Sequence, residues 1–271
     1  MKFSDFIQAK IFQKLIESRD EDMEKLHMAN EVFENIVSYI ENLNQDISNF
    51  RKNFTRDKNN RFVGINMSTV SSTPEVANMH VYFYDYDLIG IKKTVKAKAG
   101  RNIKDGDLES VYVHLFFDAP EAAKKNATTY NRWLAKNLAE ILKDPKYRSS
   151  FVHEFTHTLD FRRINPKYLV ARSIRKTAEK EAKSEINRDK YINDPLELNA
   201  YYQQAMSDLY NKLLETETVE EWNNIVGNTP QEFATKLIAN LRPQVQKRLN
   251  PENVKRLMKR ASTAWEYMRL T

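Results

Sequence analysis

The sequence FVHEFTHTLDFRR, residues 151–163, is the most informative part of this chain. It places His153 and His157, two of the five histidines, four residues apart, with Glu154 directly after the first. Side chains four residues apart lie on one face of a helix, about 5–6 Å between Cβ atoms, so both imidazoles can reach one ion. The alternative is an ordinary amphipathic helix that contains two histidines. Because histidines are so few and the pattern HExxH is complete, we favour a zinc site.

The residue between these ligands suits a catalytic role. Glu154 follows His153 by about 100° around a helix, which places it beside a metal-bound water and not on the metal. Zinc lowers the pKa of bound water from about 15.7 to about 7, and a nearby carboxylate can accept the proton and pass it to a leaving amine. We therefore predict Glu154 as the general base. Asp160, one turn after His157, either orients a ligand imidazole or is a solvated carboxylate.

The apolar residues of the same stretch indicate how the helix is held. Val152, Phe155 and Leu159 recur on the side opposite the two histidines. Their burial against a core would fix the ligand side chains in place. The chain has no cysteine, so thiolate zinc sites and cysteine nucleophiles are excluded and any metal must be held by histidine and carboxylate.

Between Arg56 and Thr128 the spacing of apolar residues changes to a period of two, which is typical of strands. The segments RFVGIN (61–66), MHVYFYDYDLIGI (79–91) and SVYVHLFFD (110–118) are rich in Val, Tyr and Phe. The basic segment KKTVKAKAGRNIKDGD between the last two is a loop or a long hairpin. These patterns predict a small antiparallel or mixed sheet, in an α+β fold with helical N-terminal and C-terminal parts.

Downstream of Thr128 the apolar spacing is helical and is interrupted at KDP, INP and INDP. The predicted helices cover 128–143, 149–163, 167–189, 195–215, 219–225, 230–241 and 251–268. Thr229-Pro230 and Asn250-Pro251 are helix-start signals for the last two. We predict a helical segment over 1–56, a catalytic domain over 57–215 and a basic helical segment over 216–271.

Both ends of the chain have features of interaction segments. Near the N-terminus a heptad seam alternates steps of three and four: Met23, Leu26, Asn30, Phe33, Val37, Ile40, Asn44 and Ile47. The seam fits either a partner helix or packing on the chain's own helices. From Lys236 to the end, nine basic residues face two acidic ones, which predicts at most weak, salt-sensitive binding of nucleic acid by the C-terminal tail.

The location of the protein is predicted from what the sequence lacks. The first residues do not form the apolar core of a signal peptide, and no apolar run approaches the roughly 20 residues of a membrane span. We therefore expect a cytoplasmic protein without a membrane association.

A family resemblance appears at HEFTHTLD, which resembles the active-site helix of the zincin metallopeptidases. The resemblance implies a helix under a small sheet whose edge strand holds the backbone of a peptide substrate, and SVYVHLFFD is the candidate for that strand. The later YINDPLELNAYYQQA gives a looser similarity to HExxH peptidases encoded in bacteriophage genomes. A phage origin would add the virion as a location.

The third zinc ligand departs from one branch of that superfamily. Metzincins continue as HExxHxxGxxH, but Asp160 and Arg163 occupy those positions here, so a gluzincin-like glutamate from a later helix is implied. Glu179 has the usual spacing but lies in a segment that is polar all round. Glu197 lies in an apolar helix and is favoured, although Asp194 and Glu197 also fit a capping box. His27, His80 and His114 are weaker candidates.

Peptide hydrolysis also needs a donor for the oxyanion. Tyr201, one turn after Glu197, is the candidate, with Tyr191 as a second, and ordinary packing is the alternative for both. The sequence thus predicts a zinc metalloendopeptidase with His153, His157 and Glu197 as ligands and Glu154 and Tyr201 as catalytic residues. The alternative is a non-catalytic structural or interaction protein, such as a phage virion component, that keeps the fold.

Overall fold

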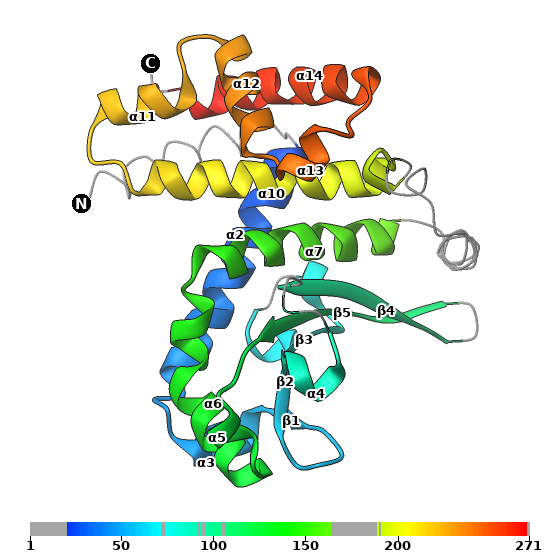
Figure 1. The fold of residues 1–271 in the computed structure, drawn as a ribbon, viewed down its shortest axis with the longest axis vertical. Coiled ribbons are helices and arrows are strands. Elements are labelled where there is room, and N and C mark those ends of the chain that lie inside the picture. Colours follow the sequence, from blue (N-terminus) through cyan, green and yellow to red (C-terminus); the bar gives the residue numbers. More distant parts are fainter. Residues whose placement is uncertain are drawn as a thin grey trace. The chain divides into compact units, whose positions relative to one another are not determined.

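The computed structural model describes residues 21–71, 74–91, 93, 96–104, 107–163, 189 and 191–269. These residues form helices and one five-stranded sheet, so the predicted α+β class is confirmed (Figure 1). The chain divides into two compact units, one of residues 29–174 and one of residues 1–28 with 175–271. The predicted three-part division of the chain stays a prediction.

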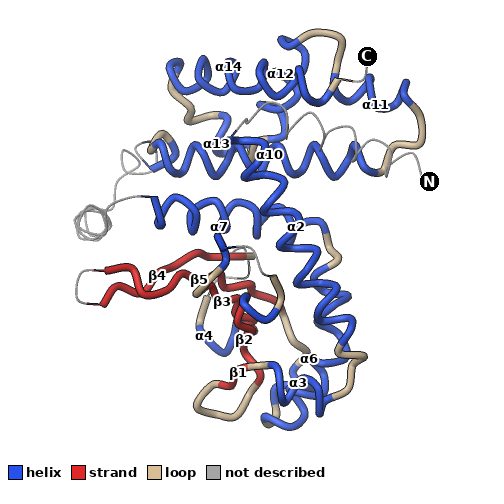
Figure 2. Tube along the Cα trace, turned by 180° about the vertical axis from the view of Figure 1, so that it is seen from behind, coloured by secondary structure: helices blue, strands red, loops and turns tan. Residues whose placement is uncertain are grey.

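The first unit contains the sheet, whose strands lie in the order β1-β2-β3-β5-β4 (Figure 2). Only β3 and β5 pair in parallel, and the other neighbours are antiparallel, so the sheet is mixed. The strands are β1 (Thr55–Arg56), β2 (Phe62–Asn66), β3 (Met79–Asp85), β4 (Ala97–Lys104) and β5 (Asp107–Phe117).

The third strand ends earlier than predicted. Within 79–91, β3 stops at Asp85 and a short helix, α4 (Tyr86–Ile89), follows. Asp85 caps this helix, because its side chain accepts a hydrogen bond from the Asp87 N–H, and Gly90 ends it in the left-handed region with φ 65°. The carboxylate of Asp85 is fully buried and also accepts the N–H of Ala119, which fixes the segment after β5. The cap at Asp85 therefore ends the strand and starts a helix that stops at Gly90, although the alternation in the sequence predicts a longer strand.

The basic segment between β3 and β5 forms the long hairpin of β4 and β5. Because β4 pairs with β5 alone, β4 is the outer strand on this side of the described sheet. The expectation that SVYVHLFFD is the edge strand was therefore wrong, since β5 is paired on both sides. Ala, Gly and Lys give β4 a low intrinsic strand preference, so β4 is stabilised mainly by its pairing with the Val- and Phe-rich β5.

Besides α4, the described helices of this unit are α3 (Ile47–Asn53), α5 (Glu121–Lys124), α6 (Ala127–Leu142), α7 (Pro145–Arg163) and most of α2 (Glu21–Asn42). Two 3-10 turns, Met67–Thr69 and Pro74–Val76, lie between β2 and β3 in the sequence. The HExxH helix α7 begins four residues earlier than predicted, because Pro145 can occupy the first helical position and Asp144 accepts the Lys146 N–H.

Packing of α7 over β4 and β5 forms the centre of the unit (Figure 1). Phe151, Val152 and Phe155 are fully buried, and the Phe151 ring lies 5.3 Å from that of Phe33 in α2. Tyr147, in the first turn of α7, donates its hydroxyl to the Phe116 carbonyl in β5. The predicted arrangement of a small sheet on the HExxH helix is confirmed.

The N-terminal seam lies on α2 and is shorter than predicted. Its members from Met23 to Ile40 are buried within the chain, whereas Asn44 lies beyond the end of α2 with φ 54° and is exposed. Residues 3–18, also predicted to be helical, lie outside the described residues. A partner helix for the seam stays a prediction.

The second unit is helical: α10 (Pro195–Leu214), α11 (Val219–Val226), α12 (Pro230–Asn240), α13 (Pro243–Gln246) and α14 (Pro251–Met268). The indole of Trp222 donates to the Met268 carbonyl and that of Trp265 to the Gly227 carbonyl, which joins α11 and α14. Several arginines of the basic tail are paired, with Arg260 bonded to both oxygens of Asp22.

None of the helices in the described part of the chain has the length and apolar character needed to cross a membrane.

Candidate metal centre

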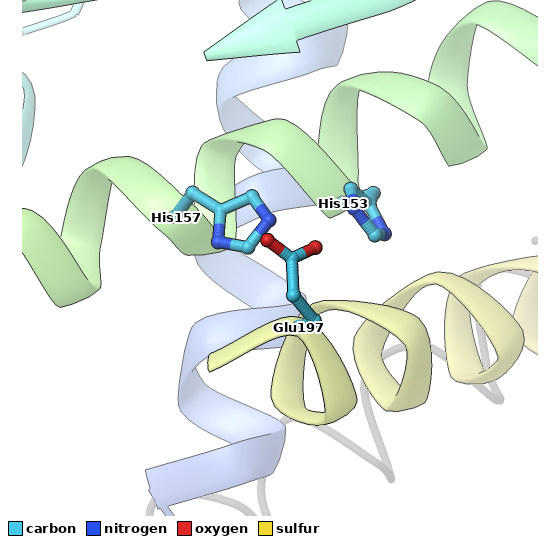
Figure 3. A group of neighbouring side chains, drawn as sticks. All are labelled: His153, His157 and Glu197. Carbon is cyan, nitrogen blue, oxygen red and sulfur yellow. The ribbon is translucent and has the colours of Figure 1, made fainter. Parts of the chain in front are cut away.

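The structure brings together the two histidines of the HExxH pattern and the favoured glutamate. One ligand atom from each of His153, His157 and Glu197 lies within 4.8 Å of the other two, and all three residues are buried (Figure 3). No other group of three His, Asp or Glu residues in the described ranges meets in this way. The group can therefore hold a metal ion.

The position of the histidines follows from α7. Their spacing of one turn places the ring centroids 5.0 Å apart with the planes at 83°. The helix around them is buried, and two of its threonines form hydrogen bonds within the helix: Thr156 donates to the Val152 carbonyl and Thr158 to the Phe155 carbonyl. The ligand side chains thus project from a helix that is fixed by its own core contacts.

Glu197 is placed by the start of α10. Asp194 is the N-cap, its side chain accepts the Leu196 N–H, and Pro195 stands at the first helical position. Glu197 is in the first turn and is only 4% exposed. The Asp194 cap is therefore real, and the Glu197 carboxylate also lies with the two imidazoles. This placement supports the ligand assignment, which stays a prediction.

The chemistry of the three donors fits zinc. Imidazole nitrogen binds zinc at about 2.0–2.1 Å and carboxylate oxygen at about 2.0–2.2 Å. Donors within 4.8 Å of one another can reach such distances from one ion after small side-chain rotations. A buried carboxylate is costly unless a cation or hydrogen bonds compensate it, and a bound metal ion would do so. Three protein ligands are also the number that leaves a position for water at a catalytic zinc.

Glu154 lies at the border between α7 and the sheet. Its side chain is half-buried, and Oε2 accepts a hydrogen bond of 2.6 Å from the Ala99 N–H in β4. The Lys96 carbonyl accepts the Phe116 N–H, so by the antiparallel alternation the backbone groups of Ala97, Ala99 and Arg101 point away from β5. The predicted general base thus contacts the outward-directed edge of the outer strand.

The remaining predicted residues have different environments. Asp160 is 7% exposed, so its interpretation as a solvated carboxylate was wrong, and its orienting role stays a prediction. Tyr201 is half-buried on α10, one turn after Glu197, whereas Tyr191 is 42% exposed. Glu179, the conventionally spaced alternative, lies outside the described residues.

The other histidines are not in this group. His80 and His114 lie in β3 and β5, and His27 lies in α2. Ala99 was not identified from the sequence. The period-two spacing of Ala97 and Ala99 within AKAGRN was the available signal for a strand at this point.

No protein family, curated protein or solved structure matches this chain. The function is therefore inferred from the chemistry of the residues themselves.

Proposed function

We propose that this protein is a zinc-dependent metallopeptidase of the zincin type, with a gluzincin-like ligand set. The observation that carries the proposal is the meeting of His153, His157 and Glu197 on two helices, with Glu154 between the histidines in sequence. Few other functions need two imidazoles, one ligand carboxylate and a second, non-ligand carboxylate at this spacing.

Glu154 carries the proton transfers in this proposal. Zinc, when bound by the three residues, supplies an activated water and polarises the scissile carbonyl. The Glu154 carboxylate accepts a proton from the attacking water and delivers it to the departing amine, so no covalent enzyme intermediate forms. Tyr201 is the proposed donor to the oxyanion, because it lies one helical turn from Glu197.

The outer strand β4 is the proposed binding edge for the substrate backbone. The outward-directed groups of Ala97, Ala99 and Arg101 can pair with an extended peptide, as in strand addition. In this structure the Ala99 N–H donates its hydrogen bond to Glu154. A substrate carbonyl that accepts this hydrogen bond instead would release the Glu154 carboxylate, which could then accept a proton from the water. The substrate is thus a peptide or protein in extended conformation.

A second candidate function is a structural metal site in a non-catalytic interaction protein, such as a virion component. The observation that favours it is the burial of all three ligands, with exposures of 7%, 8% and 4% for His153, His157 and Glu197. Structural zinc sites are closed to solvent, whereas catalytic sites keep an open position. The half-buried Glu154 at the strand edge favours the peptidase.

The substitution Glu154→Gln separates the two candidates. The amide keeps the shape and a hydrogen-bond acceptor for Ala99 but cannot take a proton, so zinc content should be unchanged and hydrolysis of an unfolded protein substrate should disappear. The exposed Glu75→Gln is the matched control and should retain activity. Equal cleavage by wild type and Glu154→Gln would show that Glu154 is not the base. Bound zinc without cleavage by either would support the structural site.

A further inference from the structure

The sheet has a second side, which faces away from α7. The Arg101 guanidinium lies 4.7 Å from the centre of the Phe161 ring in α7, so by alternation Ala97 and Ala99 face that helix too, and Lys98 and Gly100 face the other side. On that other side β3 and β5 carry five half-buried aromatic side chains: His80, Tyr82, Tyr84, Tyr112 and His114. We call these five residues the aromatic face.

The rings of the aromatic face form one continuous array. The His114 ring is central: it stacks on Tyr112 with centroids 4.7 Å apart and meets Tyr82 and Tyr84 edge-on at 5.3 and 5.1 Å. Tyr82 also contacts Tyr112, at 6.2 Å, and His80, at 5.9 Å. Contacts of this kind hold aromatic rings in fixed orientations on a surface.

Two glycines widen this array over the neighbouring strands. A Cβ atom on Gly64 in β2 would lie 2.5 Å from the Tyr82 ring, and one on Gly100 in β4 would lie 2.2 Å from the Tyr112 ring. The two rings therefore occupy the space above these glycines and lean sideways across the sheet. The planes of the two rings differ by 73°, so the rings face different directions, and each is half-buried, which leaves part of its π surface for the stacking of a flat ligand.

The strand beside the aromatic face carries positive charge. β4 contains Lys98, Arg101 and Lys104 and no acidic residue, and of these three Arg101 faces α7. Lys98 is exposed, lies opposite His114 and has no ion-pair partner among the described residues. Lys104 near the hairpin end is also exposed. An anionic ligand is thus favoured along this margin of the aromatic face.

We infer that the aromatic face binds single-stranded nucleic acid, with bases stacked on Tyr82 and Tyr112 and the phosphate backbone along Lys98. Aromatic side chains on adjacent strands of a sheet, next to a basic margin, combine the two interactions that single strands use without sequence preference. This binding is independent of the proposed peptidase activity, because it uses the other side of the sheet.

The test measures binding of a fluorescent oligothymidine of about 15 nucleotides to the full-length protein by anisotropy, over a range of salt concentrations. Tyr82→Leu and Tyr112→Leu should each weaken binding at least about fivefold, whereas Tyr82→Phe and Tyr112→Phe should bind like wild type, because stacking needs the ring and not the hydroxyl. The half-buried Tyr39→Leu in α2 is the matched control. Thermal melts of each variant exclude loss by unfolding.

The lysine contribution has its own signature in the same assay. Lys98→Ala should reduce the slope of log affinity against log salt by about 0.7, because one phosphate contact is lost, while the tyrosine variants should leave the slope unchanged. Lys255→Ala in the C-terminal tail is the control. Absence of binding at about 0.05 M salt, or loss on Lys255→Ala with normal binding by the tyrosine variants, would overturn the inference. Equal affinity for polyglutamate would do so too, since it would reveal a general polyanion site.

Discussion

The two sides of the sheet differ in what covers them, although both are built from the same alternating strands. On one side α7 packs over β4 and β5, and its buried histidines lie with Glu197. On the other, the side chains of β3 and β5 form the aromatic face, where each ring is half-buried. Period-two alternation thus allows one strand to support a metal centre with one set of residues and to form a different surface with the other set. Substitutions on one side should leave the other unchanged.

The largest expected effect is on zinc affinity and concerns the α7 side. Loss of a residue that only hydrogen-bonds to a metal ligand lowers metal affinity by about 10- to 100-fold. Glu197→Ala should lower zinc affinity by more than this, because it removes a charged ligand. A residue that only caps α10 would instead cost about 0.5–2 kcal/mol of stability and leave zinc bound. Competition with a chelator and thermal melts distinguish these outcomes.

Glu179→Ala is the matched control for that experiment. Glu179 has the conventional spacing from His157, and its segment is polar all round, so its loss should change neither zinc affinity nor stability. Loss of zinc confined to Glu179→Ala would show that the conventional spacing holds and that Glu197 is a capping residue.

The next effect is on the stability of the sheet. Gly64→Ala should destabilise the fold by about 1–3 kcal/mol, because the new Cβ would lie 2.9 Å from the Val81 carbonyl oxygen as well as 2.5 Å from the Tyr82 ring. Gly100→Ala should cost less, since its contacts are with the outer end of the Tyr112 ring, which can move aside. Urea unfolding of both variants tests this order, and zinc affinity should be unchanged in both.

The agreement between sequence and structure varies along the chain for identifiable reasons. The predicted bounds of α14 match because Asn250 and Pro251 are local start signals that act through their immediate neighbours. The end of β3 was missed because polar and aromatic residues still alternate around Asp85 in the sequence, whereas in the structure the Asp85 side chain caps the helix α4. Local signals were sufficient where capping and periodicity agreed, and they failed where the two conflicted.

The candidate site shows the same division. His153, Glu154 and His157 could be identified because their spacing is local to one helix, and Glu197 because its helix is apolar. The Glu154 contact with Ala99 could not, because it joins residues 55 positions apart through the pairing of β4, which itself depends on β5. Long-range contacts of this kind follow from the fold and not from a motif.

The smallest expected effect is a pH dependence on the aromatic side. Burial, with the positive charge of Lys98, lowers the pKa of His114 to about 4, from 6.5 for an exposed histidine. The other rings packed on His114 are the phenol rings of Tyr82, Tyr84 and Tyr112 and the apolar ring of Phe116. In the unfolded chain His114 therefore binds a proton below about pH 6.5, whereas in the folded chain it binds this proton only below about pH 4.

The stabilisation by neutral His114 is thus complete above pH 6.5 and is lost as the pH falls toward 4. His114→Phe should flatten this dependence by a fraction of the about 1.4 kcal/mol per pH unit that one proton contributes, because the side chain is partly exposed. Urea unfolding at several pH values from 7 to 4 measures it, as the difference between the variant and wild type. Parallel curves for the two proteins would contradict the assignment.

Zinc content measures the central claim most directly. Protein purified without chelator, offered zinc and then freed of excess metal should contain about one zinc ion per chain by elemental analysis. His157→Ala should lose this zinc, whereas His114→Ala, on the aromatic face, should retain it. Wild-type protein without stoichiometric zinc, or equal zinc content in wild type and His157→Ala, would contradict a metal centre at His153, His157 and Glu197.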